Sequence, residues 1–257
     1  MQLLSRILEN LRNSLAFLTL IPIGQKKILS DQEFGRLPGY FPLVGLCIGV
    51  LTLVLALMIE FVNLPKAVIA IFLVAFQVIL TRGFHLDGLA DTADALLSHR
   101  SIERKLEILK DSHLGTFGVL AIVLDVLLKA SLLASLENAQ GGIPASALLL
   151  FPIWGRLAAS VVAATSTYAR PSPGLGYNMV AHSTNKDLAF AVFTTAFISI
   201  WFGPLNLLIA AIVALFGAAL VWVWKKALGG VTGDLLGASV ELGEIFSLIL
   251  FSILFKI

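Results

Sequence analysis

Charged residues are scarce in this chain. Only 13% of its 257 residues are Asp, Glu, Lys or Arg, and 58% are hydrophobic, whereas about a quarter of the residues of soluble domains are charged. The one cysteine, Cys47, excludes an internal disulfide framework and a cysteine-based zinc site. A net charge of +2 is too small to indicate a nucleic-acid partner. These shortages indicate an integral membrane protein, with the lipid bilayer as its surroundings.

The hydrophobic runs predict an all-α fold, a polytopic helical bundle in the membrane. A helix that crosses the hydrocarbon core needs about 20 mostly apolar residues, and backbone in lipid must satisfy its own hydrogen bonds. We expect a single membrane-embedded domain over residues 1–257 with about seven transmembrane segments, which lie at approximately 43–62, 66–82, 115–136, 145–166, 188–203, 205–224 and 235–255.

Residues 1–24 differ from these runs. Leucine and isoleucine recur there at helical spacing, with Arg, Glu and Asn residues between them. The segment also lacks the small-residue cleavage site of a signal peptide. We therefore expect a retained N-terminal amphipathic helix that lies on the membrane interface or dips into it.

The positive charges of the loops fall almost entirely on one side of the predicted membrane. Cytoplasmic loops carry the excess of Lys and Arg. With a cytoplasmic N-terminus, the opposite side carries only Lys66 and Lys256. The cytoplasmic side then carries Arg6, Arg12, Lys26, Lys27, Arg36, Arg100, Arg104, Lys105, Lys110, Arg170, Lys186, Lys225 and Lys226. We expect a multi-pass protein of the cytoplasmic (inner) membrane whose active site faces the cytoplasm.

One stretch between two apolar runs concentrates acidic residues. Asp87, Asp91 and Asp94 are spaced i, i+4 and i+7, which places three carboxylates on one face of a helix. Like charges at this spacing repel, and they repel more strongly where water is excluded. A divalent cation such as Mg²⁺ would relieve the repulsion and bind substrate phosphate oxygens. The alternative interpretation is a plain solvated loop between helices.

Two glycine-containing stretches have more than one interpretation. Gly115 and Gly118 either place the N–H groups of a helix N-terminus against a phosphate or form a notch for close helix packing. Asp234 lies in the Gly-rich stretch 229–237 and is expected at an N-cap position. There it either caps a helix or helps to hold a nucleotide or a second metal ion.

Charges inside the predicted spans need partners, because they are costly in the membrane. Asp125 and Lys129 are four residues apart and are expected to pair with each other. Arg156 has no partner nearby in the sequence. It pairs with Glu241 or Glu244, or it reaches toward a phosphate.

Five segments together resemble a known family. HLDGLADTADAL at 85–96 and LEILKDSHLGTFG at 106–118 are similar to the signature of the cobalamin synthases, the adenosylcobinamide-GDP ribazoletransferases. FPLVGLCIG at 41–49, YARPSPGLG at 168–176 and ALGGVTGDLLGASVELGE at 227–244 resemble further motifs of that family. Their order and spacing agree along essentially the whole chain, which makes the combination specific although each motif alone is weak.

The resemblance implies a Mg²⁺-dependent transferase that joins adenosylcobinamide-GDP to α-ribazole, or to α-ribazole 5′-phosphate, and releases GMP. Phosphoryl transfer requires positioning and positive charge around the oxygens, and Mg²⁺ supplies such charge. Asp87, Asp91 and Asp94 are then expected as metal ligands, with Asp111 as a fourth ligand or as the acceptor of the nucleophile's proton. The expected substrate-binding residues are Arg82, His85, Lys110, Gly115, Thr116, Arg170, Lys225, Thr232 and Asp234.

Two other classes remain as alternatives. The CDP-alcohol phosphotransferases also carry aspartates at i, i+4 spacing, but with Ala-Arg after the first acidic pair, where this chain has Thr92-Ala93-Asp94. A cation transporter would place its acids near the bilayer midplane, whereas these acids are expected in a loop or at a helix end. A homo-oligomer, or an association with other enzymes of cobalamin assembly, is left open by the sequence.

Overall fold

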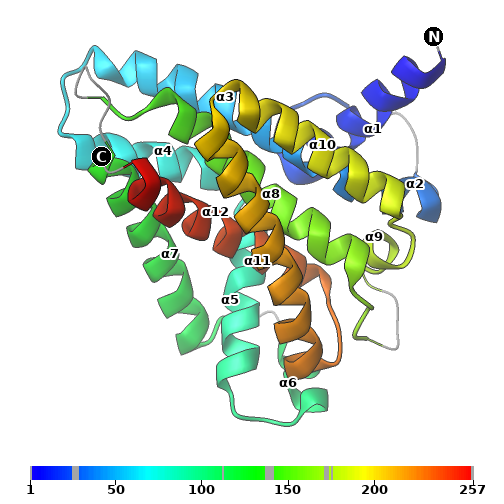
Figure 1. Ribbon diagram of the computed structural model, residues 1–257. Coiled ribbons are helices and arrows are strands. Elements are labelled where there is room, and N and C mark those ends of the chain that lie inside the picture. Colours follow the sequence, from blue (N-terminus) through cyan, green and yellow to red (C-terminus); the bar gives the residue numbers. More distant parts are fainter. Residues whose placement is uncertain are drawn as a thin grey trace.

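The computed structural model describes residues 2–24, 29–111, 113–136, 142–170, 174 and 176–255, and these form helices and loops without a β-strand (Figure 1). The all-α prediction is therefore confirmed. The elements are α1 Gln2–Leu18, α2 Asp31–Arg36, the 3-10 helix η1 Leu37–Tyr40, α3 Phe41–Glu60, α4 Lys66–Leu80, α5 Phe84–Leu97, α6 Ile102–Ile108, α7 Thr116–Ser135, α8 Ala145–Thr165, α9 Tyr177–Ala181, α10 Asn185–Trp201, α11 Pro204–Leu228 and α12 Gly233–Phe255.

The lengths of the helices support a polytopic membrane protein, but not the predicted count of seven spans. In the described residues, the segments long and apolar enough to cross a membrane are Asp31–Glu60, Thr116–Ser135, Ala145–Thr165, Pro204–Leu228 and Gly233–Phe255. The bent pair α4–α5 makes a sixth if it counts as one span. Helix α10 has 17 residues and is about 25 Å long, which is shorter than the hydrocarbon core of about 30 Å.

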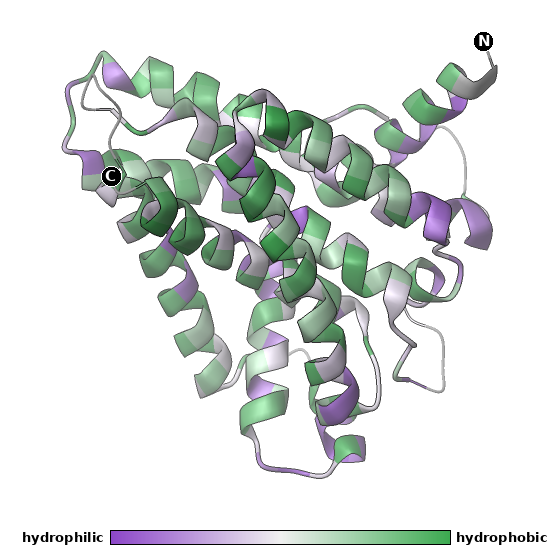
Figure 2. Cartoon of the chain, viewed as in Figure 1, coloured by the Kyte–Doolittle hydropathy of each residue, from purple (hydrophilic) through white to green (hydrophobic). Residues whose placement is uncertain are grey.

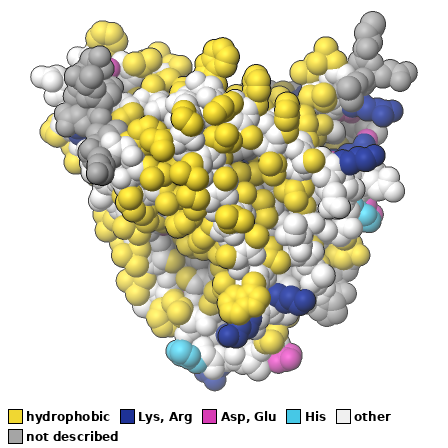
Figure 3. All heavy atoms as spheres, in the orientation of Figure 1, with side chains coloured by type: hydrophobic (Ala, Val, Ile, Leu, Met, Phe, Trp, Pro, Cys, Tyr) yellow, Lys and Arg dark blue, Asp and Glu magenta, His cyan; other side chains and the backbone are white. Residues whose placement is uncertain are grey.

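Helix α8 is the centre of the bundle. Every residue from Phe151 to Ala163 is buried, because α3, α10, α11 and α12 pack around this helix. The outward faces of the long helices remain apolar (Figure 2), and they expose large side chains such as Phe193, Trp201 and Trp222. On the face drawn in Figure 3, hydrophobic side chains cover the middle, while charged side chains gather mainly at the lower and right-hand edges. Such a surface suits lipid around the middle and water at the rim.

The amphipathic helix expected at the N-terminus is α1. Leu15 and Leu18 are buried against the bundle, whereas Leu4 and Leu8 are exposed one turn apart. Beyond α1, Arg82 Nη2 donates a hydrogen bond of 3.0 Å to the carbonyl oxygen of Phe17. The end of α1 is thus attached to the bundle, and its position relative to the membrane surface stays a prediction.

A sharp turn separates α4 from α5. The two helices are bent by 91° at a short break, where Arg82 and Gly83 have φ angles of 58° and 64°. Left-handed backbone costs a residue with a Cβ about 1–2 kcal/mol, but it costs glycine little. The predicted span 66–82 therefore ends early, because helix α4 stops at Leu80. The acidic residues begin a separate helix that leaves in a new direction.

The loops that carry the candidate residues meet, as the distribution of charges predicts. Asn178 Nδ2 donates to Asp31 Oδ1 at 2.8 Å, which joins α9 to α2. Tyr168 and Val231 form a parallel β-bridge between the loops that follow α8 and α11. Lys26, Lys27, Lys256 and residues 171–173 of the resemblance lie outside the described residues.

Candidate active site

Helix α5 holds Asp87, Asp91 and Asp94 on successive turns, as their spacing predicts. Its other face is buried and carries small residues, including Gly88 and Ala90. A Cβ at Gly88 would stand 2.5 Å from the carbonyl oxygen of Asp234. Only glycine therefore lets α5 approach the first turn of α12 this closely, and the approach brings a fourth aspartate to the acidic face.

Asp91 is at the centre of this acidic group. Helix α5 is not one of the five single helical segments that could span the membrane by themselves, and Asp91 is only partly buried. Burial, followed by the carboxylates of Asp87, Asp234 and Asp94, raises the pKa of Asp91 to about 7, although Arg170 opposes the shift. The negative charges are thus close enough to disfavour one another, so the site attracts a cation or a proton.

Arg170 is the basic member of the site. Two backbone hydrogen bonds, of 2.8 and 2.9 Å, join residues 167–169 to Val231 and fix the base of both loops. Arg170 Nη2 then donates to Asp234 Oδ2 at 2.9 Å and to the carbonyl oxygen of Leu109 at 3.0 Å. One guanidinium therefore links the loop after α8, the start of α12 and the end of α6.

The N-cap position expected for Asp234 is wrong. Helix α12 begins at Gly233, so Asp234 is already inside the first turn. Its Oδ2 accepts hydrogen bonds from Arg170 and, at 3.1 Å, from Thr232 Oγ1. The carboxylate is held by side chains rather than by the helix N-terminus, which leaves it beside Asp91.

Asp94 caps another helix instead of facing open solvent. It accepts hydrogen bonds from Gly115 N at 2.8 Å and from Gly118 N at 2.9 Å, at the start of α7. A Cβ at either glycine would stand 2.4 Å from a carboxylate oxygen of Asp94. These glycines form a notch that admits a carboxylate, and their N–H groups are not free for a phosphate. A negative charge here is also favourable for the dipole of α7.

Asp111 pairs with His113. Its Oδ1 lies 2.6 Å from His113 Nδ1, and both side chains are exposed. The hydrogen bonds from His113 hold the pKa of Asp111 below its usual value, and the same contact raises the pKa of His113. Asp111 is not among the groups that shift the pKa of Asp91, so the structure does not join it to the other three aspartates.

The remaining predicted residues are scattered around the acidic face. Lys110 and Thr116 are exposed on either side of the 111–115 loop, and Lys225 is exposed in the last turn of α11. Arg82 lies with Asp87 in one open groove. His85 is buried, and its Nδ1 lacks a hydrogen-bond partner in the described part of the chain.

A second cluster of charges is buried between the helices. Lys129 Nζ pairs with Glu241 Oε2, lies 2.7 Å from Glu244 Oε2 and lies 3.3 Å from Asp125 Oδ2. Arg156 Nη1 donates to Glu244 Oε1 at 2.5 Å. The expected pair of Asp125 and Lys129 is confirmed, and the open question about Arg156 is answered by Glu244. The contact of Lys129 with α12 was missed, because no local pattern links residues so distant in the sequence.

The acidic face offers carboxylate oxygens as metal ligands, but these side chains alone do not form a complete metal site. No group of three His, Cys, Asp or Glu side chains among the described residues lies close enough to hold a metal ion. The donors beside Asp91 are carboxylates on neighbouring turns and on α12. Mg²⁺ commonly takes one or two carboxylates and completes its octahedron with water and phosphate oxygens, so this donor set fits Mg²⁺ with Asp87 and Asp91 as ligands.

The long apolar helices define a polytopic membrane protein. Its polar site lies at helix ends, where an acidic group with one arginine is accessible to solvent. The sequence model of the family described as Cobalamin-5-phosphate synthase matches residues 10–252. The chain therefore belongs to the cobalamin-5-phosphate synthase family.

Curated relatives agree with this assignment. An adenosylcobinamide-GDP ribazoletransferase of Acetivibrio thermocellus is 39% identical over 248 residues, which cover 96% of this chain and 98% of the relative. The enzymes of the same name from Desulfitobacterium hafniense and Acinetobacter baumannii are 38% and 37% identical, over 92% and 90% of this chain and 93% and 92% of their own lengths. No solved structure matches. The resemblance found in the motifs is confirmed, and the chain is a transferase of cobalamin biosynthesis rather than a transporter.

Proposed function

We propose that this protein joins adenosylcobinamide-GDP to α-ribazole, or to its 5′-phosphate, at the acidic face of α5. The observation that carries the proposal is the group formed by Asp87, Asp91 and Asp234 with Arg170 beside it. Relatives that cover nearly the whole chain carry the name of this activity. The group supplies the two features that phosphoryl transfer needs, cation-binding oxygens and a fixed positive charge.

The chemistry is an exchange at phosphorus. A free ribose hydroxyl of the acceptor, other than the 5′-oxygen that carries the phosphate in α-ribazole 5′-phosphate, loses its proton, and its oxygen forms a bond to the phosphorus that carries the cobinamide. The anhydride bond from that phosphorus to GMP breaks, so adenosylcobalamin (or its phosphate) and GMP leave. Mg²⁺, when bound, would supply positive charge at the pyrophosphate oxygens.

The protein's own residues have separate tasks in this proposal. Asp87 and Asp91 would hold the cation, while Arg170 orients Asp234 and offers its remaining N–H groups to a phosphate oxygen. Asp91, with its raised pKa, is also the carboxylate best able to accept a proton near neutral pH. Asp94 sets the position of α7 through its cap. The loops around the site carry the excess of Lys and Arg, so we propose that the site faces the cytoplasm from the inner membrane.

The experiment is product analysis with purified protein in proteoliposomes. The protein receives adenosylcobinamide-GDP and α-ribazole with Mg²⁺, and GMP and the cobalamin product are measured by mass spectrometry. We expect both products in equal amounts, and we expect EDTA to stop their formation and Mg²⁺ to restore it. Product formation that EDTA leaves unchanged would contradict the metal assignment. CMP release from a CDP-alcohol and its acceptor, given in place of these substrates, would contradict the substrate assignment.

A further inference from the structure

Two cavities share one aromatic pair in their walls. Phe17, at the end of α1, and Phe84, at the start of α5, meet edge to face with ring centroids 5.4 Å apart. Both side chains line a wide groove, and both also line a narrow slot. A reaction with two substrates needs two binding spaces that open on the same reacting atoms.

The wide groove is open and partly polar. It offers about 850 Å³ of free space, and its walls include Arg82, Asp87 and Ile122. Asp87 belongs to the acidic face described above, so a molecule in the groove lies directly beside the proposed cation. The size and the mixed lining suit a bulky substrate that carries both apolar and charged groups.

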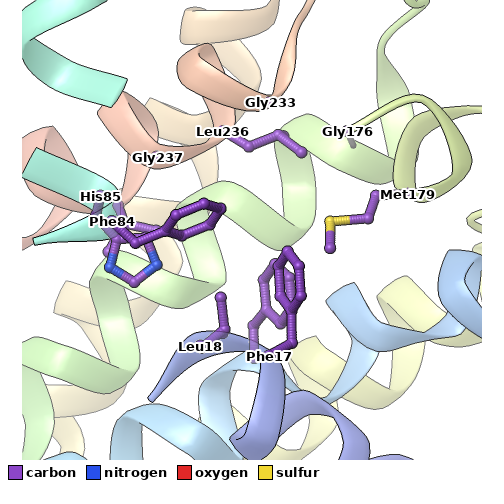
Figure 4. Close-up of a pocket in the computed structure, with 11 residues that line it drawn as sticks. Phe17, Leu18, Phe84, His85, Gly176, Met179, Gly233, Leu236 and Gly237 are labelled. Atoms are coloured by element: carbon purple, nitrogen blue, oxygen red, sulfur yellow. The ribbon is translucent and has the colours of Figure 1, made fainter. Parts of the chain in front are cut away.

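The narrow slot is almost entirely apolar. Figure 4 shows the side chains of Leu18, Met179 and Leu236 around it, with His85 beside Phe84 at one edge. His85 is the polar side chain among the described residues that line the slot, and the free space is about 30 Å³. Glycines of α12 and of the loop before α9 form part of the wall, which leaves flat surfaces for a ring to lie against.

The slot opens next to the reacting residues. Gly233, in its wall, directly precedes Asp234, and Phe84 stands three residues, about one helical turn, before Asp87 on the same face of α5. A Cβ at Gly88 would stand 2.5 Å from the carbonyl oxygen of Asp234, so Phe84 and Gly233 bring the slot to the place where α5 and α12 approach each other, beside the acidic face. A ring bound there would direct its attached sugar toward that face.

We propose that the slot binds the aromatic base of the ribonucleoside acceptor and that the groove binds the GDP-activated corrinoid. This inference rests on the proposed function and extends it to the position of each substrate. The Phe17–Phe84 pair is then the wall between the two substrates. The described residues that line the slot do not include any of the aspartates from which the site was first recognised.

The chemistry of the candidates decides which ring enters the slot. Guanine carries N–H donors and a carbonyl oxygen, which an apolar slot with one histidine would leave largely unpaired at a cost of about 1–3 kcal/mol each. A corrin ring with its amide side chains is too large for the space. The dimethylbenzimidazole base of α-ribazole is flat, has no N–H donor and offers one ring nitrogen as an acceptor. It is the part of either substrate that matches the lining.

The slot is closed in this structure and must widen to admit such a base. Met179 and Leu18 are the side chains best suited to move, because unbranched and terminal-branched chains change rotamer at low cost. Widening the slot would also require movement of α1, whose end is held by the hydrogen bond from Arg82 to the carbonyl oxygen of Phe17. Affinity for the nucleoside should therefore respond to the volume of the side chains in the slot.

The test compares one substitution in each cavity, in the full-length protein in proteoliposomes. Leu236→Phe fills the slot, and Ile122→Phe, the matched control, fills the groove. We expect Leu236→Phe to raise the KM for α-ribazole about tenfold or more while the KM for adenosylcobinamide-GDP stays within twofold. We expect Ile122→Phe to do the reverse. Equal changes in both KM values, or the opposite assignment, would overturn the proposal.

A change of base size provides a readout that a folding defect would not produce. The riboside of unsubstituted benzimidazole lacks two methyl groups, so it should recover most of the KM lost in Leu236→Phe. Val240→Ala, which enlarges the slot, should favour bases with larger substituents. Unchanged base preference in both variants would overturn the slot assignment. Absence of product from the unmodified protein would instead contradict the proposed function itself.

Discussion

The acidic face of α5 and the buried charge cluster are built from the same kinds of residue with opposite results. In the cluster, Lys129 and Arg156 contact three carboxylates between the helices. In the site, Asp87, Asp91, Asp94 and Asp234 have only Arg170 as a described ion-pair partner. Charges that serve the fold are neutralised by the protein, because burial in a membrane leaves no other partner. Charges that serve a ligand are left for the ligand to neutralise.

The largest expected effect is at the centre of the site. Asp91→Asn keeps the shape of the side chain and removes the charge, so we expect turnover to fall by roughly 10²–10³-fold, as for the loss of one electrostatic stabiliser. GMP release measures the loss. Glu103→Gln, an exposed carboxylate on α6, is the matched control and should leave turnover unchanged. Full activity of the Asp91→Asn protein would contradict the proposed cation site.

The next effect is on stability, in the buried cluster. Lys129→Met leaves Asp125, Glu241 and Glu244 with Arg156 alone, and breaking a buried ion pair costs about 3–5 kcal/mol. We expect lower yield and a lower unfolding temperature in detergent. Adding Glu241→Gln to Lys129→Met should recover part of the loss, because it removes the carboxylate that Lys129 contacts on α12. A double variant no more stable than the single one would contradict the described pairing.

A smaller effect separates a helix cap from a metal ligand. Asp94→Ala removes two hydrogen bonds to the start of α7, and losing a cap costs about 0.5–2 kcal/mol. Asp94→Asn retains one accepting oxygen. We therefore expect this variant to be more stable, and to release GMP faster, than Asp91→Asn. Thermal unfolding and GMP release, measured on the same preparations, give both values. Equal loss of activity in Asp94→Asn and Asp91→Asn would show that Asp94 holds the cation as well.

The smallest effect concerns the exposed pair of Asp111 and His113. The contact raises the pKa of His113 and lowers the pKa of Asp111. Its stabilisation is therefore present between the ordinary pKa values of the two groups. It is lost as pH rises through the raised pKa of His113 and as pH falls through the lowered pKa of Asp111. Asp111→Asn should lower the pKa of His113 in an NMR titration and change turnover less than tenfold. If Asp111→Asn lowered turnover as much as Asp91→Asn does, Asp111 would again count as a metal ligand.

The sequence was informative where a local rule applies. Apolar length gives most of the spans, and the spacing of Asp87, Asp91 and Asp94 gives a shared helical face because that spacing is a property of the helix itself. The rule fails where tertiary contact decides. Asp94 faces the acidic side, yet its oxygens bind Gly115 and Gly118. Glu241 and Lys129 are joined across two helices, and the walls of the slot come from α1, α3, α5, α9 and α12. No single stretch contains these contacts.

The left-handed pair Arg82 and Gly83 constrains the chain in a way that its exposure does not suggest. An insertion in a solvent-exposed link is usually tolerated, but here the link sets the direction from which α5 starts. One extra residue within α5 would rotate everything after it by about 100°, and one in the link would aim the whole helix elsewhere. The aspartates would then face lipid or α8 instead of Arg170. The length of this short link is thus expected to be fixed.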